Sequence, residues 1–164
     1  MMKNNKGFSY IELLIVLGIM AVAIGFVSLV PGMIGRTNVN KAADKLVTAL
    51  GKARTTSVAK GTYEGQMMIT CDGNDINCFV GNLTATSKVF QNIARTPVQL
   101  YYVYDDGSSH LLENGYFVSI RFDQSSGAFA KNAVDAYVDK LILTDGEHTA
   151  TIQLYKETGK FEIK

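Results

Sequence analysis

Hydrophobic and polar positions divide this chain into four stretches, and the first two differ sharply. Residues 1–7 are polar and include Lys3 and Lys6, whereas residues 8–30 are apolar with a single charged residue, Glu12. As a helix, the 23 residues of the apolar run would be about 35 Å long, enough to cross a hydrocarbon core of about 30 Å. The pattern therefore predicts a short leader, residues 1–7, and a transmembrane helix, residues 8–30.

The third stretch, residues 31–60, has the spacing of an amphipathic helix. Pro31 lacks a backbone N–H and crowds the carbonyl of Val27, which predicts a bend or a melted turn around residues 27–35. Apolar residues then recur every three to four positions: Val39, Ala42, Ala43, Leu46, Val47, Leu50 and Ala53. This stripe predicts a stem helix that packs on a single partner surface and ends at a glycine cap, Gly61. With the apolar run it would form one helix of roughly fifty residues.

The fourth stretch, residues 61–164, is predicted to be a β-rich head. Apolar and polar residues alternate over residues 116–122 and 149–155, and residues 99–104, 137–143 and 160–163 also favour strands. Turn dipeptides separate them: Asp106-Gly107, Asn114-Gly115, Ser126-Gly127, Asp145-Gly146 and Thr158-Gly159. Residues 84–96 follow neither pattern. We expect an α+β fold with a long N-terminal helix on an antiparallel sheet.

Charge is distributed unevenly although the net charge is only +1. Between residues 31 and 60 there are six basic residues and one acid, whereas from residue 61 onward there are eight basic and thirteen acidic residues. An acidic head disfavours nucleic acid as a partner, because neutralisation of phosphates supplies most of that affinity.

The apolar run admits three interpretations. A secretory signal peptide could be cleaved after Ala21-Val22-Ala23, but the apolar residues continue beyond that point and enclose an acid. A plain membrane anchor explains the length but leaves Glu12 unexplained, since a carboxylate is costly inside a membrane helix. The third interpretation is a signal that is cleaved before the apolar helix and leaves that helix intact.

Gly7-Phe8-Ser9-Tyr10-Ile11-Glu12-Leu13-Leu14 closely resembles the class III signal of type IV pilins and pseudopilins. The resemblance implies that a prepilin peptidase cleaves after Gly7 and that the new N-terminal residue, Phe8, is N-methylated. Glu12 then takes the position of the glutamate found fifth in the mature family members. It also implies the pilin fold, with the kink at Pro31 in its usual neighbourhood.

The same resemblance implies the partners and the location of the protein. Its partners would be other pilin or pseudopilin subunits, the prepilin peptidase and an inner-membrane assembly platform. The chain would be a single-pass membrane protein with an extracytoplasmic head, and part of a cell-surface filament after assembly. A pilus subunit, a pseudopilin of a secretion or DNA-uptake machine, and a ligand-binding minor pilin at a tip all remain open. The last fifty or so residues loosely resemble the heads of minor pseudopilins of the H type.

Glu12 is the residue to which we assign an assembly role. After cleavage it would lie about 6 Å along the helix from the Phe8 amine. A carboxylate drawn out of water needs an ammonium partner, and the resemblance implies that this partner is the amine of a neighbouring subunit. Pairing with its own Phe8 amine, or recognition by the peptidase alone, are the alternatives.

The only two cysteines, Cys71 and Cys78, flank a polar segment. In an exported head we expect them to form a disulfide, with two reduced thiols or a calcium site as alternatives. We expect no metal, no cofactor and no enzymatic activity. Ser57-Val58-Ala59-Lys60 has a Ser-x-x-Lys form without its companion motifs, and His110 and His148 have no ligand cluster at suitable spacing.

Overall fold

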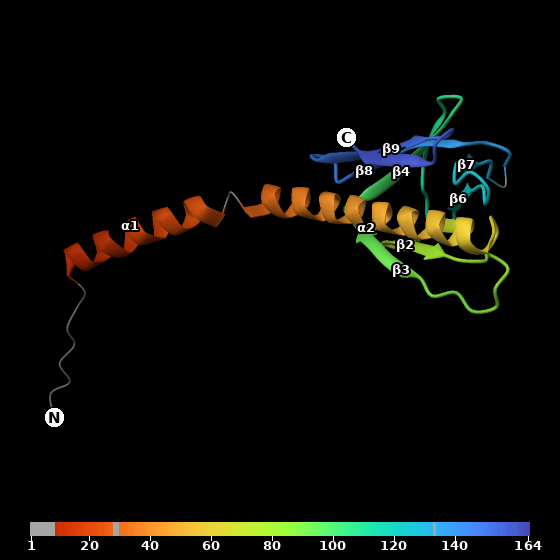
Figure 1. Ribbon diagram of the computed structural model, residues 1–164. Coiled ribbons are helices and arrows are strands. Elements are labelled where there is room, and N and C mark those ends of the chain that lie inside the picture. Colours follow the sequence, from red (N-terminus) through yellow and green to blue (C-terminus); the bar gives the residue numbers. More distant parts are fainter. Residues whose placement is uncertain (1–8, 28–29, 133) are drawn as a thin grey trace. The chain divides into compact units, whose positions relative to one another are not determined.

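A computed structural model of the chain describes residues 9–27, 30–132 and 134–164. It divides into two compact units, Met1–Ile34 and Gly35–Lys164. Helix α1 is Tyr10–Val27, and helix α2 is Val30–Lys60 (Figure 1). The strands are β1 Met67–Asp72, β2 Asp75–Val80, β3 Gln91–Arg95, β4 Gln99–Tyr104, β5 Ser109–Leu111, β6 Phe117–Phe122, β7 Phe129–Ala130, β8 Val138–Thr144, β9 Thr149–Tyr155 and β10 Lys160–Ile163.

The ends of α2 follow from two residues with special backbones. Pro31 is the second residue of the helix. The N–H groups of the first turn have no carbonyl partner within the helix, so a proline there costs no hydrogen bond. Gly61 follows the last helical residue with φ +123°, and its N–H donates to the Ser57 carbonyl at 2.8 Å, which confirms the predicted cap. The predicted kink concerns residues 28–29, which lie outside the described residues, so it stays a prediction.

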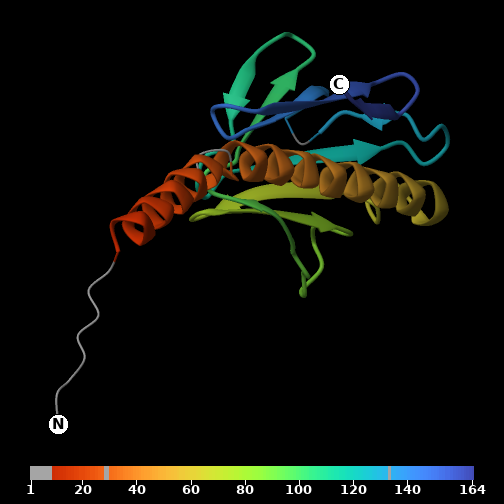
Figure 2. The ribbon, with the colours of Figure 1, turned by 90° about the vertical axis from the view of Figure 1, so that its left-hand side faces the viewer.

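The strands form two antiparallel sheets rather than the one that the sequence predicted. One sheet has the order β3-β2-β1-β6-β7, and the other has the order β10-β9-β8-β4-β5. The chain crosses between them after β3, after β5 and after β7. Figure 2 shows the two sheets with the stem part of α2 running along both. The α+β class with an N-terminal helix is confirmed, and the fold is consistent with a pilin fold.

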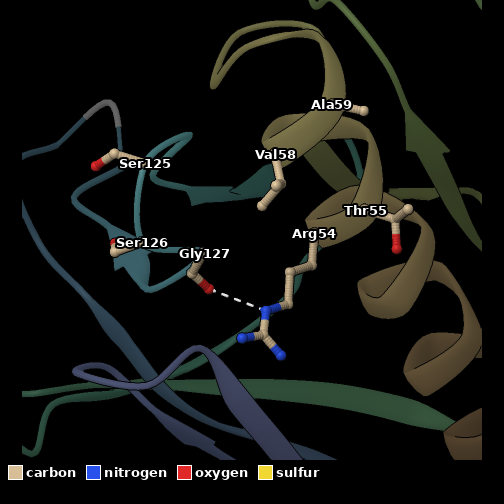
Figure 3. A pocket seen from close by; sticks show the side chains of 7 residues that line it. All are labelled: Arg54, Thr55, Val58, Ala59, Ser125, Ser126 and Gly127. Atoms are coloured by element: carbon tan, nitrogen blue, oxygen red, sulfur yellow. Dashed lines mark hydrogen bonds between the residues drawn. The ribbon is translucent and has the colours of Figure 1, made fainter.

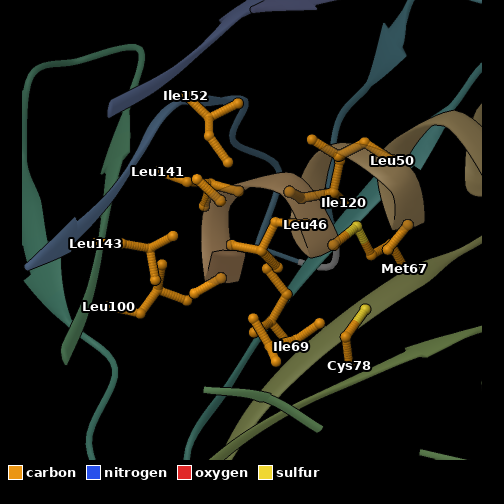
Figure 4. Close-up of a cluster of buried hydrophobic side chains, with 14 of the residues drawn as sticks. Leu46, Leu50, Met67, Ile69, Cys78, Leu100, Ile120, Leu141, Leu143 and Ile152 are labelled. Atoms are coloured by element: carbon orange, nitrogen blue, oxygen red, sulfur yellow. The ribbon is translucent and has the colours of Figure 1, made fainter. Parts of the chain in front are cut away.

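The core lies where α2 meets the two sheets. Leu46 and Leu50 of α2 are completely buried, and in Figure 4 they point among side chains of both sheets. The surrounding residues are Met67, Ile69, Cys78 and Ile120 from one sheet and Leu100, Leu141, Leu143 and Ile152 from the other. The predicted stripe is therefore the buried face of the helix, and it has two partner surfaces instead of one.

The alternating segments are confirmed as strands. Residues 116–122 correspond to β6 and residues 149–155 to β9, and the three weaker segments correspond to β4, β8 and β10. Every turn glycine that the sequence singled out has a left-handed φ, between +63° and +96°. Residues 84–96, which carried no pattern, contain β3.

The predicted disulfide is wrong, and the strand register gives the reason. The two cysteines lie on neighbouring strands of a hairpin, in which Cys71 pairs with Ile76 and Cys78 pairs with Ile69. They are therefore diagonal neighbours on one face, for which Cα atoms lie about 7–8 Å apart. A disulfide needs Cα atoms within about 4.4–6.8 Å. Both cysteines are free thiols, and the segment between them is a tight turn instead of an open loop.

The two thiols have different environments. Cys78 is buried in the core, and this burial raises its pKa to about 12, although the charge of Lys52 acts in the opposite direction. Cys71 is half-buried, and its pKa is raised by burial first and then by the charges of Asp72 and Asp75. Since the thiolate is the reactive form, both side chains are poor nucleophiles at neutral pH, and Cys78 is the poorer.

We predict that Cys71 and Cys78 are labelled differently by an alkylating agent. Without any reductant at pH 8, Cys71 should react slowly and Cys78 not at all in the folded chain, because its thiol is buried and protonated. In denaturant, again without reductant, both should react completely. Mass spectrometry after digestion counts the labels. Thiols that need reduction before they react would restore the disulfide.

A second prediction concerns Gly65, which packs against the last turns of α2. A Cβ at this position would overlap the Ser57 hydroxyl and the Ala53 carbonyl oxygen. Gly65→Ala should therefore lower the free energy of unfolding by about 1–3 kcal/mol, the usual cost of overpacking. Thermal unfolding of the full chain, followed by the near-ultraviolet circular dichroism of its tyrosines, measures the change.

Gly51→Ala is the matched control for Gly65→Ala. Gly51 lies inside α2, and its Cβ would meet only the edge of Phe161 at 3.9 Å, an ordinary contact. Alanine is the better helix former, so this variant should gain about 0.5–1 kcal/mol. Equal stability losses in both variants would contradict the packing described for Gly65.

Candidate functional site

The first turn of α1 places Glu12 in a defined hydrogen bond. The helix begins at Tyr10, so Ser9 is its N-cap residue and Glu12 is the third helical residue. The backbone N–H of Ser9 donates to the Glu12 carboxylate (Oε2) at 2.9 Å, and the Leu13 N–H donates to the Ser9 carbonyl at 3.2 Å. This is the backward half of a capping box, in which a glutamate satisfies the N-cap amide.

The carboxylate is favoured in this position for a second reason. The free amides of the first turn give a helix N-terminus a partial positive charge, which stabilises an anion there. Sequence reasoning assigned Glu12 to assembly and missed this local contact, although the Ser9-x-x-Glu12 spacing was sufficient to predict it. Among the described residues, Glu12 therefore has a backbone partner in its own chain, the Ser9 N–H. Gly7 and Phe8, the predicted cleavage and methylation residues, lie outside the described residues.

The described part of α1 leaves its side chains uncovered. All of residues 9–22 are exposed, and the large apolar ones range from 48% exposed at Leu14 to 77% at Tyr10. Apart from the backbone of its own helix, no atom of the described residues lies within 4 Å of where a Cβ of Gly18 would be, and Gly18 lies with Ile15, Ile19 and Val22 around a shallow apolar depression. A continuous apolar surface of this kind marks a contact with a membrane or with another protein.

The membrane helix predicted from the sequence was tested on the same residues. Among the described parts of the chain, no helix is both long and apolar enough to cross a membrane. The predicted span, residues 8–30, includes residues 8, 28 and 29, which are not described, and it stays a prediction.

A pocket of the second unit is lined by an arginine that is hydrogen-bonded to the backbone. Arg54 of α2 lies at its edge with Val58, Ser125, Ser126 and Gly127 (Figure 3). The Arg54 guanidinium donates from Nε to the Gly127 carbonyl and from Nη2 to the Thr158 carbonyl, both at 3.1 Å. Because both bonds go to backbone atoms, the arginine fastens two turns to the helix.

The turn at this pocket is also held by a carboxylate. The hydroxyl groups of Ser125 and Ser126 donate to Asp123 at 2.6 and 2.8 Å, and with the backbone N–H of Ser126 they lower the pKa of Asp123 to about 2. Asp123 therefore stays ionised in its turn at physiological pH, and the stability that it contributes is present above its ordinary pKa of 3.8 and is lost as the pH falls from there through about 2.

The remaining candidate residues are not arranged as a reactive site. Ser57 is completely buried, and its hydroxyl has no hydrogen-bond partner among the residues that the structure describes, so it is inaccessible to a substrate. His110 lies beside Tyr102 and Tyr104 at ring distances of 5.5 and 5.6 Å, and His148 contacts Asp145 across a turn. Within the described residues, no group of three or more His, Cys, Asp or Glu side chains could hold a metal ion.

Comparison with known proteins places one segment of the chain in a family. Residues 2–28 match the family model described as the prokaryotic N-terminal methylation motif. No curated protein and no solved structure matches the chain. The matched residues include the predicted cleavage position, Gly7-Phe8, and the capped glutamate, Glu12. The chain thus carries a segment similar to the N-terminal methylation signal of prepilins, which supports its resemblance to the type IV pilin-like family.

Proposed function

We propose that the chain is a structural subunit of a type IV pilus or of a related filament, such as a pseudopilus. It is made as a precursor held in the membrane by residues 8–30, with its head on the extracytoplasmic side. A prepilin peptidase removes residues 1–7, and an inner-membrane assembly platform joins the trimmed subunit to others. The uncovered apolar surface of α1, a helix that lies within the segment matching the methylation motif, is the observation that carries this proposal.

The apolar side chains of α1 support two successive environments for this helix. In the single subunit, lipid would cover Tyr10, Ile19 and the other exposed residues, since nothing within the described chain does so. In a filament, the same side chains would pack against the helices of neighbouring subunits. Gly18 favours that packing, because a small residue lets helix backbones approach closely.

The capping contact describes the bonding of the Glu12 carboxylate before assembly, and assembly would add a second partner to it. In the single subunit, its carboxylate accepts from the Ser9 N–H at the start of α1. In a filament, we propose that the carboxylate also pairs with the Phe8 amine of a neighbouring subunit. One oxygen, Oε2, is bonded to Ser9, and a carboxylate can accept several hydrogen bonds at once. Such a pair would fix the axial register of adjacent subunits.

The first test of this proposal is the N-terminus of the mature chain. We predict that protein isolated from its native host begins at Phe8 and is about 14 Da heavier when that residue is methylated. Intact-mass and peptide mass spectrometry measure both. Gly7→Leu should block trimming, because a bulky residue replaces the small one before the cleaved bond. A mature chain that begins at Ile24 would instead establish an ordinary signal peptide.

The second test separates the two roles of Glu12. Glutamine at the third helical position can also cap an N-terminus, so Glu12→Gln retains the capping bond and loses only the charge. Glu12→Leu loses both. If the charge pairs with a neighbouring amine, both variants should be trimmed and inserted normally but be nearly absent from sheared filaments, since a buried ammonium without its partner costs several kcal/mol.

Capping alone would give a different pattern. Loss of a cap costs about 0.5–2 kcal/mol of helix stability, so Glu12→Leu would assemble poorly while Glu12→Gln assembled like the wild type. That outcome, measured by quantitative immunoblotting of the filament fraction against the membrane fraction, would remove the proposed charge pair.

A further inference from the structure

Positive charge collects at one end of the second unit, next to the point where the apolar run ends. Arg36 is the second residue of that unit, and Lys41 follows it on α2. Both side chains are exposed. At about 1.5 Å per residue, Lys41 lies about 8 Å along the helix from Arg36. Chain connectivity therefore keeps both cations close to the apolar residues before them.

The β3 strand adds to this basic end from the side. Lys45 of α2 donates to the carbonyls of Asn92 and Ile93 at 3.0 and 3.3 Å, which fixes its ammonium group beside β3. Lys41, Lys45 and Arg95 together line a depression of about 360 Å³ between α2 and β3. The basic end is thus a surface formed by four residues, Arg36, Lys41, Lys45 and Arg95.

Two carboxylates belong to the same part of the surface: Asp44 precedes Lys45 in the sequence, and Asp75 pairs with Arg95. Asp44 is exposed on α2, and Asp75 accepts from Arg95 at 2.8 Å. The surface therefore keeps an excess of positive charge, whereas the rest of the head from residue 61 onward has more acidic than basic residues. An ordinary solvated helix face would not require basic residues to be separated from acidic residues along the chain.

We propose that the basic end binds the anionic headgroups of phospholipids in the leaflet that faces the head. This inference rests on the proposed membrane anchor, which would bring Arg36 to the lipid–water interface. Lys41 lies within about one screening length, 8–10 Å, of that residue at physiological salt, so it acts on the same headgroups. Phosphate groups on lipid match both the point charge of lysine and the planar fork of arginine.

The bound lipid would hold the head against the membrane before assembly. Extraction of a subunit into a filament would then break these contacts together with those of the apolar helix. The basic end would thus act in the membrane-resident subunit.

The experiment measures which lipid gathers at the basic end of the full chain. A fluorophore is attached at Asn40→Cys, an exposed position of α2, in a Cys71→Ala background. Cys78 is buried with a raised pKa and stays unlabelled. The chain is reconstituted into vesicles of equal parts phosphatidylcholine and phosphatidylglycerol, in which one lipid or the other carries the same quencher near the top of an acyl chain.

We expect stronger quenching by phosphatidylglycerol at low salt, and a loss of this preference at high salt. Arg36→Glu with Lys41→Glu should lower the phosphatidylglycerol preference by about fivefold or more for each cation removed. Lys52→Glu is the matched control. Lys52 is exposed on the same helix, about 16 Å beyond Lys41 and outside the screening length, so the preference should stay unchanged.

Three outcomes would overturn the proposal. Equal quenching by both lipids would show that the basic end is an ordinary solvated surface. A second outcome combines equal quenching in the parent chain with loss of filament assembly in the Arg36→Glu, Lys41→Glu variant. It would assign these cations to the acidic face of a second subunit. A chain that fails to float with either kind of vesicle would remove the membrane anchor itself, and with it this inference.

Discussion

The burial of one face of α2 between two sheets is the constraint on which the second unit depends. Neither sheet can exclude water from its inner face without the helix, because Leu46 and Leu50 fill the space between strands of both. The chain crosses repeatedly from one sheet to the other, so neither sheet is formed from one continuous part of the sequence. Removing the helix would therefore expose both apolar faces at once, and we infer that stem and head fold as one unit.

Much of this fold follows from local pattern, and the exceptions have physical reasons. Alternation predicted β6 and β9, since each has one buried and one mixed face. It failed for β5 and β7, which have only three and two residues. The presence of two sheets depends on the pairing of β1 with β6 and of β4 with β8. These partners are distant in sequence, and a local pattern holds no information about them.

The candidate site was likewise predictable from the sequence only in part. The position of Glu12 in an apolar run predicted an assembly role, which stays a prediction; Glu12 lies within the segment that matches the methylation motif. Its bond to Ser9 was equally accessible from the spacing. The cysteines were misjudged because Asp72, Asn74, Asp75 and Asn77 crowd the segment between them, as in a loop. Only the strand register shows that Asp72 and Asp75 flank a hairpin turn and that the two thiols are diagonal neighbours.

The bonds from Arg54 to two turns have a mechanical consequence. The guanidinium donates hydrogen bonds to the carbonyls of Gly127 and Thr158, which follow β6 and β9, strands of different sheets. A force applied along α2 would pull the helix parallel to the two sheets. It would load the Arg54 hydrogen bonds and the buried apolar contacts of α2 at the same time, so that many contacts must break together instead of one after another. Resistance to a pulling force is set by the rate of unfolding, not by equilibrium stability. In a fibre under tension, this arrangement would let the stem transmit force to the head without sliding out of it.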